Sequence, residues 1–483
     1  MMDFAGYRYV AMLVVLIEIA VILMTYRRNP KLAIYVVLLS IVLKGQYLWF
    51  GRAIFAWQVA SIFGLAYIGS GQIRRTARNA GRALGFMRMS MLLYFIYTIS
   101  ISFPMWLVFS AEGLGNAGTE VNATRILTQL VYFGFVIGLF GLGLRAGRHL
   151  TTASLLNAII IIAALAAYGA ILQTLIMHLV GINIFPIIGS DDTTRSAFIL
   201  GSTFRANSFV GEPKHLGLLM SMGLISYYLT RLFRIPAGGR FAWHKPLAMT
   251  AALILSLSTT GIVITAGGIA VASTIFYRRL RASDLAAVSI LVGVLLTQVI
   301  GSGADFGSSL ERQLSKTDLE VQDQSVRDGL LANKSLFVTG TGLGNIHLIA
   351  VDHLPATFPL FRDQGYKANS GLFFVVGDSG LIGLLLLVAS PFFALQGYAR
   401  MRRRLAPDQR KEVLASLALL LVSGFSFLLR YDPGYFLFSG FVFTRLALVR
   451  QAALGHDPTL VPTAGETRPP HTPPPTPVGT QPV

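Results

Sequence analysis

The segment TFRANSFVGEPKHLG, residues 203–217, brings several chemically active side chains to the edge of an apolar stretch. Arg205 and Lys214 are cations that can bind an anion such as a phosphate. Glu212 is the best-placed group to accept a proton from an attacking hydroxyl, and His215 follows it within one helical turn as a second candidate. The alternative of equal weight is that Glu212 only caps the next helix and pairs with Arg205 or Lys214. Charged groups beside a hydrocarbon layer are costly, so the segment indicates function.

The composition shows which kind of element must position this segment. Hydrophobic residues make up 54% of the 483 residues, and charged residues make up 13%. Apolar runs near the roughly 20 residues that cross a bilayer recur from Phe4 to Leu448. Cysteine is absent, which excludes disulfides and thiol catalysis. The net charge of +18 lies in short basic clusters between apolar runs, a pattern of membrane topology rather than of nucleic-acid binding.

We predict an all-α integral membrane protein with about 13 transmembrane helices, in a range of 12–14. The predicted spans cover residues 4–26, 31–48, 53–70, 89–109, 126–144, 151–180, 213–230, two spans between 246 and 277, 284–301, 370–397, 412–429 and 434–449. An alternative for the region between 246 and 277 is a broken, re-entrant pair. Basic clusters such as residues 74–88 and 400–404 are predicted to be cytoplasmic, which places the N-terminus outside and the C-terminal tail inside.

Three parts of the chain are predicted. They are a membrane unit of residues 1–450, a large external loop of residues 302–367 within it, and a disordered Pro-rich cytoplasmic tail of residues 451–483. Apolar residues recur near helical spacing in residues 308–337, so we expect the loop to be partly helical. The run GTGLGN, residues 340–345, is expected to be a tight turn, because a phosphate-binding loop needs a strand before it and a helix after it.

Three segments resemble the O-antigen polymerase and O-antigen ligase superfamily of bacterial membrane glycosyltransferases. They are TFRANSFVGEPKHLGLLMSM at 203–222, RDGLLANKSLFVTGTGLGN at 327–345 and ANSGLFFVVGDSGLIGLLLLV at 368–388. With the many-span layout, the resemblance covers roughly residues 90–450. Ligases of this family place a histidine implicated in catalysis where this chain has Ala368, so the resemblance favours a polymerase over a ligase.

The resemblance implies transfer of glycan from undecaprenyl diphosphate to a hydroxyl of an acceptor sugar, and our hypothesis is an inverting-type polymerase. The reaction would take place at the periplasmic face of the bacterial inner membrane, where the N-terminus and the large loop are predicted to lie. No nucleotide, metal or other cofactor is expected, because cations and helix ends can neutralise the diphosphate. The implied partners are the lipid-linked oligosaccharide, membrane lipid and a chain-length regulator or export machinery, and they include no nucleic acid.

The candidate site combines groups from several external segments. The helices that start at Pro213 and Asn369 are expected to point their positive dipole ends at the diphosphate. The candidates for substrate binding are Arg195, Arg205, Lys214, Arg327, Arg362, Asn369 and Arg430, and the candidates for the general base are Glu212, His215, His347 and His353. Solvated charge is the alternative for the two loop arginines, and a local pair with Asp432 is the alternative for Arg430.

Two other functions stay open at this stage. A glycan ligase is the closest alternative to the polymerase. A transporter or flippase belongs to a different class and would place charges at mid-membrane on discontinuous helices. Glu18 and Asp378 are the main acidic residues within the predicted spans, and Asp378 lies near Gly377 and Gly380.

Overall fold

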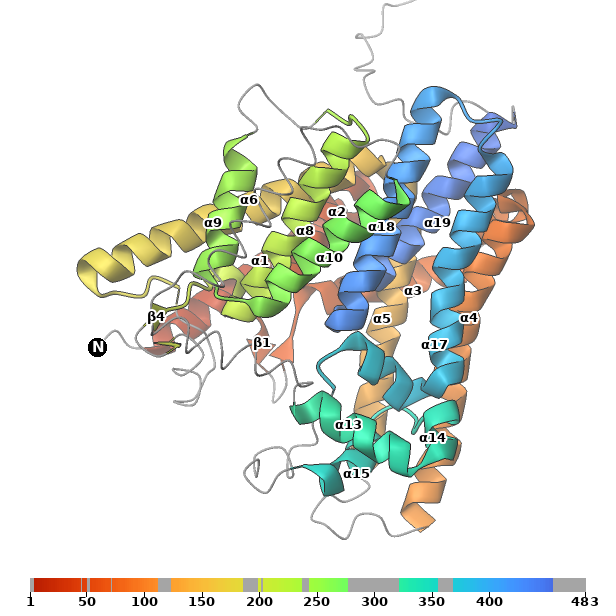
Figure 1. Ribbon diagram of the computed structural model, residues 1–483, viewed down its shortest axis with the longest axis horizontal. Coiled ribbons are helices and arrows are strands. Elements are labelled where there is room, and N and C mark those ends of the chain that lie inside the picture. Colours follow the sequence, from red (N-terminus) through yellow and green to blue (C-terminus); the bar gives the residue numbers. More distant parts are fainter. Residues whose placement is uncertain are drawn as a thin grey trace, which may run out of the picture.

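The chain folds into a bundle of α-helices, which we describe from a computed structural model (Figure 1). The structure describes residues 4–44, 46–49, 53–70, 72–111, 123–185, 199–200, 203–236, 243–276, 321–354 and 368–454. Seven of the described helices are long and apolar enough to cross a membrane. They are α1 Phe4–Arg28, α4 Gln72–Ala111, α5 Ala123–His149, α6 Thr152–Val180, α17 Gly371–Met401, α18 Pro407–Leu429 and α19 Gly434–Ala453. The protein is therefore an α-helical membrane protein, as predicted.

The 20-residue helix α8 and several shorter elements complete the bundle. They are α2 Pro30–Val42, α3 Ala56–Gly69, α8 Pro213–Leu232, α9 His244–Leu255, α10 Thr259–Ile275, the 3-10 turn η2 Ser208–Val210, and the antiparallel pairs β1 Leu48–Trp49 with β2 Ala53–Ile54 and β3 Ile199–Leu200 with β4 Thr203–Phe204. At 13 and 14 residues, α2 and α3 are shorter than a full span requires. The count of 13 spans is not confirmed, and the predicted span 284–301 lies outside the described residues.

Helices α9 and α10 follow each other in the chain, and both pack against α8. With 12 residues, α9 is only about 18 Å long at 1.5 Å per residue, which is less than the hydrocarbon layer of ~30 Å. The turn between the two helices, at Ser256–Ser258, lies against Gly217 in the first turns of α8. These lengths fit the alternative of a broken, re-entrant pair better than two full spans.

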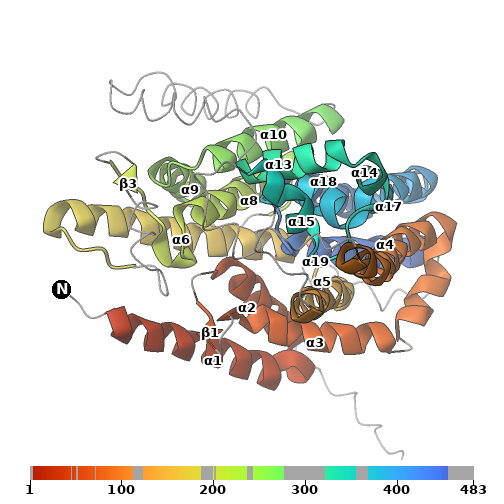
Figure 2. The ribbon, with the colours of Figure 1, turned by 90° about the horizontal axis from the view of Figure 1, so that it is seen from below.

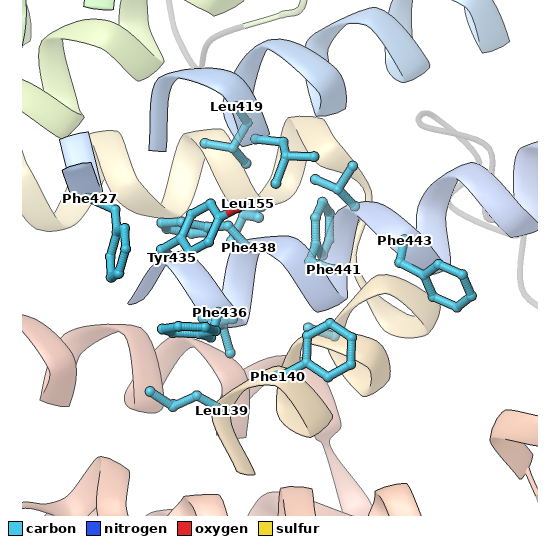
Figure 3. Packing of buried hydrophobic residues seen from close by; sticks show 14 of the residues in the cluster. Leu139, Phe140, Leu155, Leu419, Phe427, Tyr435, Phe436, Phe438, Phe441 and Phe443 are labelled. Carbon is cyan, nitrogen blue, oxygen red and sulfur yellow. The ribbon is translucent and has the colours of Figure 1, made fainter. Parts of the chain in front are cut away.

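The centre of the bundle is the contact of α19 with α5. Glycines 138 and 143 bring α5 against the backbones of α3 and α19, because a side chain at either position would collide with a neighbouring carbonyl. Figure 3 shows aromatic rings from α5, α18 and α19 packed together at this core. Phe427 and Tyr435 stack with their ring centroids 5.0 Å apart. This packing fixes the turn between α18 and α19, which borders the candidate site.

The described part of the long loop forms a helical cap at one end of the bundle (Figures 1 and 2). Its elements are α13 Val321–Ala332, α14 Lys334–Thr339, α15 Ile346–Ala350 and the 3-10 turn η5 Val351–His353. Within the stretch 308–337 that was expected to be partly helical, the described residues contain α13 and α14, whereas residues 302–320 and 355–367 lie outside the described part. We refer to this end, where α17 begins, as the cap end.

The GTGLGN run makes a tight turn that inserts between the helices. Gly340, Gly342 and Gly344 have φ angles of 86°, 78° and 82°, which side chains rarely adopt. Helix α17 is broken where Gly380 has a φ of 64°. The backbone N–H groups of Thr341 and Gly342 donate to the carbonyls of Gly377 and Asp378, at 2.8 and 2.9 Å. The loop thus satisfies carbonyls beside the break in α17.

Candidate functional site

The segment before α8 is held on α6 by a buried amide network. Asn207 and Gln173 are both fully buried. Oε1 of Gln173 accepts hydrogen bonds from the backbone N–H groups of Asn207 and Ser208, at 3.0 and 2.8 Å. The side-chain amide of Asn207 donates to the carbonyls of Phe185 and Gly211, at 2.9 and 3.2 Å. Two buried amides therefore fix the backbone that carries the charged residues on either side.

The same segment is bound on its other side by the α9–α10 turn. The N–H of Ala206 donates to the carbonyl of Leu255 at 3.0 Å, and Nε of Arg205 donates to the carbonyl of Ser256 at 3.2 Å. Burial lowers the pKa of the Arg205 guanidinium, and the nearby Glu212 carboxylate opposes this shift. Arg205 is thus a half-buried cation in a fixed position near Glu212.

Helix α8 begins with Glu212 at its N-cap and Pro213 in its first turn. The Glu212 side chain makes no capping hydrogen bond, so the capping role considered as the alternative for this residue is not observed. Its Oε2 lies 3.5 Å from Nδ1 of His215, and the two side chains are 48% and 17% exposed. Glu212 therefore lies toward solvent, and His215 lies inward.

His215 lines an apolar cavity of about 80 Å³ at the cap end of the bundle. The cavity is formed by α2, α6, α8, α18 and α19. Its apolar walls are Leu38, Ile41, Val42, Ile159, Ile162, Leu218, Leu219, Met222, Leu437 and Phe438, and its polar lining groups are Lys44, His215, Ser423, Ser426, Asp432 and Tyr435. We call it the α8 cavity. Such a combination of apolar walls and a few convergent polar groups is typical of a small-molecule site.

Positive charge surrounds the polar side of this cavity. Lys44 lines it, and the charges of Lys214 and Arg430 also lie near the His215 ring. Oδ1 of Asp432 accepts the N–H of Gly434 at 2.8 Å, which shapes the turn between α18 and α19. Cations at the edge of an apolar pocket match an amphiphile with an anionic head.

The start of α17 has a different partner. The N–H groups of Asn369 and Ser370 donate to the Asp323 carboxylate at 2.8 and 3.2 Å, and the amide of Asn369 bonds to Gln322. Asp323 is buried. A carboxylate of α13 therefore occupies the anion position that the sequence suggested for the diphosphate. The carbonyl of Asn369 accepts the N–H of Tyr431 at 3.1 Å, which joins this helix start to the α18–α19 turn.

The remaining candidates lie apart from the α8 cavity. Arg327 bonds to Asp328 at 2.9 Å on the exposed side of α13, in agreement with ordinary surface charge. His347 is buried in the cap, and His353 is exposed. Arg195 and Arg362 lie outside the described residues. Among the residues that the structure describes, no group of three or more His, Asp or Glu side chains is placed to hold a metal.

Sequence reasoning missed Lys44 and Gln173. A signal for Lys44 was present, because this lysine lies near the end of the predicted span 31–48, where a charged side chain beside the hydrocarbon layer is costly. Gln173 gave no such signal, since its partners Asn207 and Ser208 lie 34 and 35 positions away. Its role appears only when α6 and the segment before α8 are brought together.

Comparisons with known proteins give no further assignment. No model of a known protein family matches the chain, and no curated protein matches it. The family resemblance therefore stays a prediction, and function is argued from the site.

Proposed function

We propose that the protein is a glycan polymerase that uses a polyprenyl-diphosphate-linked donor at the cap end of the membrane domain. The observation that carries the proposal is the α8 cavity, in which His215 and Lys44 meet apolar walls beside Arg430 and Lys214. A lipid-linked diphosphate needs these two surfaces together, one apolar and one cationic. The donor and the acceptor are both lipid-linked oligosaccharides in this proposal.

The cations bind the diphosphate of the donor. Lys44 lines the cavity itself, whereas Arg205 is fixed beside Glu212 at the neighbouring segment. Hydrogen bonds from charged donors to phosphate oxygens are roughly twice as strong as neutral ones. They stabilise the negative charge that develops on the leaving group, without a metal ion in the proposed reaction.

The volume of the cavity limits what it holds. About 80 Å³ is roughly two to three times the ~30 Å³ that a water molecule takes in the liquid. This space accommodates part of the diphosphate and the first carbons of the lipid, and the rest of the polyprenyl chain extends into the bilayer. The aliphatic walls from α2, α6 and α8 suit that path.

His215 is the general base in the proposed reaction. The oxygen of the acceptor hydroxyl attacks the anomeric carbon of the donor sugar, and the bond from that carbon to the diphosphate oxygen breaks. The hydroxyl proton moves to the imidazole, and polyprenyl diphosphate leaves with the bonding electron pair. Because Nδ1 lies toward Glu212, we assign Nε2 as the ring nitrogen that accepts the proton from the hydroxyl. Glu212 orients the ring in this proposal. The sequence had suggested Glu212 as the first candidate for the base and His215 as the second, and the proposal reverses that order.

A transporter is the second candidate, and the break in α17 is the observation that favours it. Asp378 is buried beside Gly380, where the helix is interrupted. Discontinuous helices form ion and substrate sites in many transporters. In this protein, however, the carbonyls of Gly377 and Asp378 already accept hydrogen bonds from residues 341 and 342. A chain segment thus binds where an ion would be coordinated.

Reconstitution into liposomes tests the proposed function. The purified protein is given an oligosaccharide linked to polyprenyl diphosphate, with no nucleotide and with a chelator present, and products are separated by chain length. We expect longer glycans and release of polyprenyl diphosphate. Movement of the lipid-linked oligosaccharide across the bilayer without extension would favour the transporter and overturn the proposal.

Charge variants connect this activity to the cavity. Lys44→Met removes the lysine that lines it, and Lys411→Met is the matched control, because Lys411 is an exposed residue paired with Asp408 in the first turn of α18. We expect Lys44→Met to raise the KM for the donor about tenfold or more, from loss of a charge-assisted bond of ~1.5–3 kcal/mol. Equal KM values in the two variants would contradict the assigned role.

A further inference from the structure

A second cavity lies at the end of the bundle opposite the cap, between the start of α4, the end of α17 and the end of α19 (Figure 1). Its volume is about 320 Å³. The lining residues are Gly81, Arg82, Ala83, Leu84, Gly397, Arg400, Met401, Arg404, Arg450, Ala453 and Leu454. We call it the arginine cavity. It lies at the far end of α19 from the α8 cavity and belongs to no part of the proposed reaction.

Four arginines line this cavity: Arg82 in α4, Arg400 in α17, Arg450 in α19 and Arg404 in the turn that follows α17. None of the described residues that line the cavity is acidic. No ion pair among the described residues involves Arg82, Arg400 or Arg404. The charges of Arg82, Arg400 and Arg404 therefore lie close together with no acidic partner among the described residues, and like charges repel each other. Such an arrangement is stabilised by an anion that binds between them.

The backbone of α4 shapes the cavity. Helical geometry breaks at Gly81, which has a φ of 79°, and the Arg450 guanidinium lies where a side chain at position 81 would be. Leu84 packs against Gly397, so α4 and α17 approach closely at this place. The break thus makes room for an arginine of α19 beside an arginine of α4. The cationic groups are held by the contact of three helices rather than by a flexible tail.

We propose that the arginine cavity binds a phosphate-bearing anion, such as the headgroup of an anionic membrane lipid or a soluble phosphate compound. Guanidinium groups form paired hydrogen bonds with phosphate oxygens. The space is about ten times the ~30 Å³ of a water molecule in the liquid, which admits a phosphate with further polar atoms. Leu84, Met401 and Leu454 line the same cavity and provide apolar contact for a lipid. Basic pockets between membrane helices are known to bind such headgroups.

Native mass spectrometry of the full chain in detergent tests the proposal. The probes are cardiolipin, phosphatidylglycerol and, in a parallel titration that follows thermal unfolding, inorganic pyrophosphate. Phosphatidylcholine, a zwitterion whose headgroup has no net charge, is the comparison. We expect at least one anionic probe to bind with defined stoichiometry and at least tenfold more tightly than phosphatidylcholine. Binding of the lipids alone identifies a headgroup as the ligand, and binding of pyrophosphate alone identifies a soluble compound. Binding of none would overturn the proposal.

The double variant Arg400→Gln with Arg404→Gln has a closely matched control. Arg402→Gln with Arg403→Gln removes the same charge from the same exposed turn, but neither residue lines the cavity. We expect the first pair to weaken binding of the anionic probe at least tenfold and the second pair to weaken it less than twofold. All four side chains are exposed, so both proteins should keep their unfolding temperature. An equal loss in the two variants would show general attraction to a basic surface and refute a defined site.

Discussion

Helices α8 and α17 both begin at the cap end beside the α18–α19 turn, but their first turns have different surroundings. At α17, the Asp323 carboxylate accepts the N–H groups of Asn369 and Ser370. At α8, the Glu212 side chain makes no cap, and His215 faces the α8 cavity. One helix start is occupied by the protein's own carboxylate, whereas the other borders a space with cations around it.

The two helix starts therefore differ in what satisfies their attraction for negative charge. A helix start attracts negative charge through its N–H groups and its dipole, whether that charge comes from the protein or from a ligand. Asp323 uses the attraction at α17 to attach the cap to the bundle. At α8 the Glu212 side chain makes no such bond, and in our proposal the attraction acts on the substrate. Variants at both helix starts test whether the start of α17 has a role in stability and the start of α8 has a role in substrate binding.

Replacement of His215 should have the largest effect. His215→Asn keeps a polar side chain of similar size but removes the base, and general base catalysis contributes roughly 10²–10⁴-fold to rate. We expect chain extension in liposomes to fall by that factor, with normal folding. His178→Asn, at an exposed position near the end of α6, is the control. A rate equal to that of the unchanged protein would exclude His215 as the base.

Replacement of Asp323 should reduce stability instead. Asp323→Ala removes a charged acceptor and leaves the N–H groups of Asn369 and Ser370 unsatisfied, at a cost of about 3 kcal/mol or more. Unfolding in detergent measures the change. Asp328→Ala removes a partly exposed carboxylate from the same helix and should cost no more than ~1 kcal/mol. Equal stability of the two variants would contradict the stabilising role assigned to Asp323.

The sequence alone predicted the helices that can be recognised from their own length and hydrophobicity. Long apolar runs predicted α5, α6, α17, α18 and α19, because spanning a hydrocarbon layer needs only length and hydrophobicity. It was not sufficient for α9, whose 12 residues looked like part of a full span. The sequence predicted a tight turn at residues 340–345, but neither the insertion of this turn nor the break at Gly380 was predicted, since each satisfies the other's backbone only after folding.

The candidate site was predictable in location and not in detail. Arg205, Glu212, Lys214 and His215 stood out as charges beside an apolar run. Whether a helix start is filled depends on a residue elsewhere in the chain. Asp323 is 46 positions from Asn369, and no pattern near either residue predicts their contact. The ranking of residues within the site therefore had to come from the structure.

Gln173→Leu should show how much the α8 site depends on its support. The change leaves the N–H groups of Asn207 and Ser208 buried without their acceptor, which costs roughly 1–3 kcal/mol in stability. Activity should fall as well, because the charged segment loses its fixed position. Thr174→Val is the control, since Thr174 bonds only within its own helix. A stable variant with full activity would show that this network does not position the site.

Glu212→Gln should have the smallest effect of the four changes. The 3.5 Å contact with His215 is long, and Glu212 is 48% exposed, so its loss should cost about 1 kcal/mol, or roughly fivefold in rate. Stability should stay nearly constant because no capping bond is lost. The measurement is chain extension by Glu212→Gln, by His215→Asn and by the double variant. If Glu212 acts through His215, the double variant should be no slower than His215→Asn alone. A loss with Glu212→Gln as large as that with His215→Asn would instead make the carboxylate the base and would place the chemistry on the exposed side of α8.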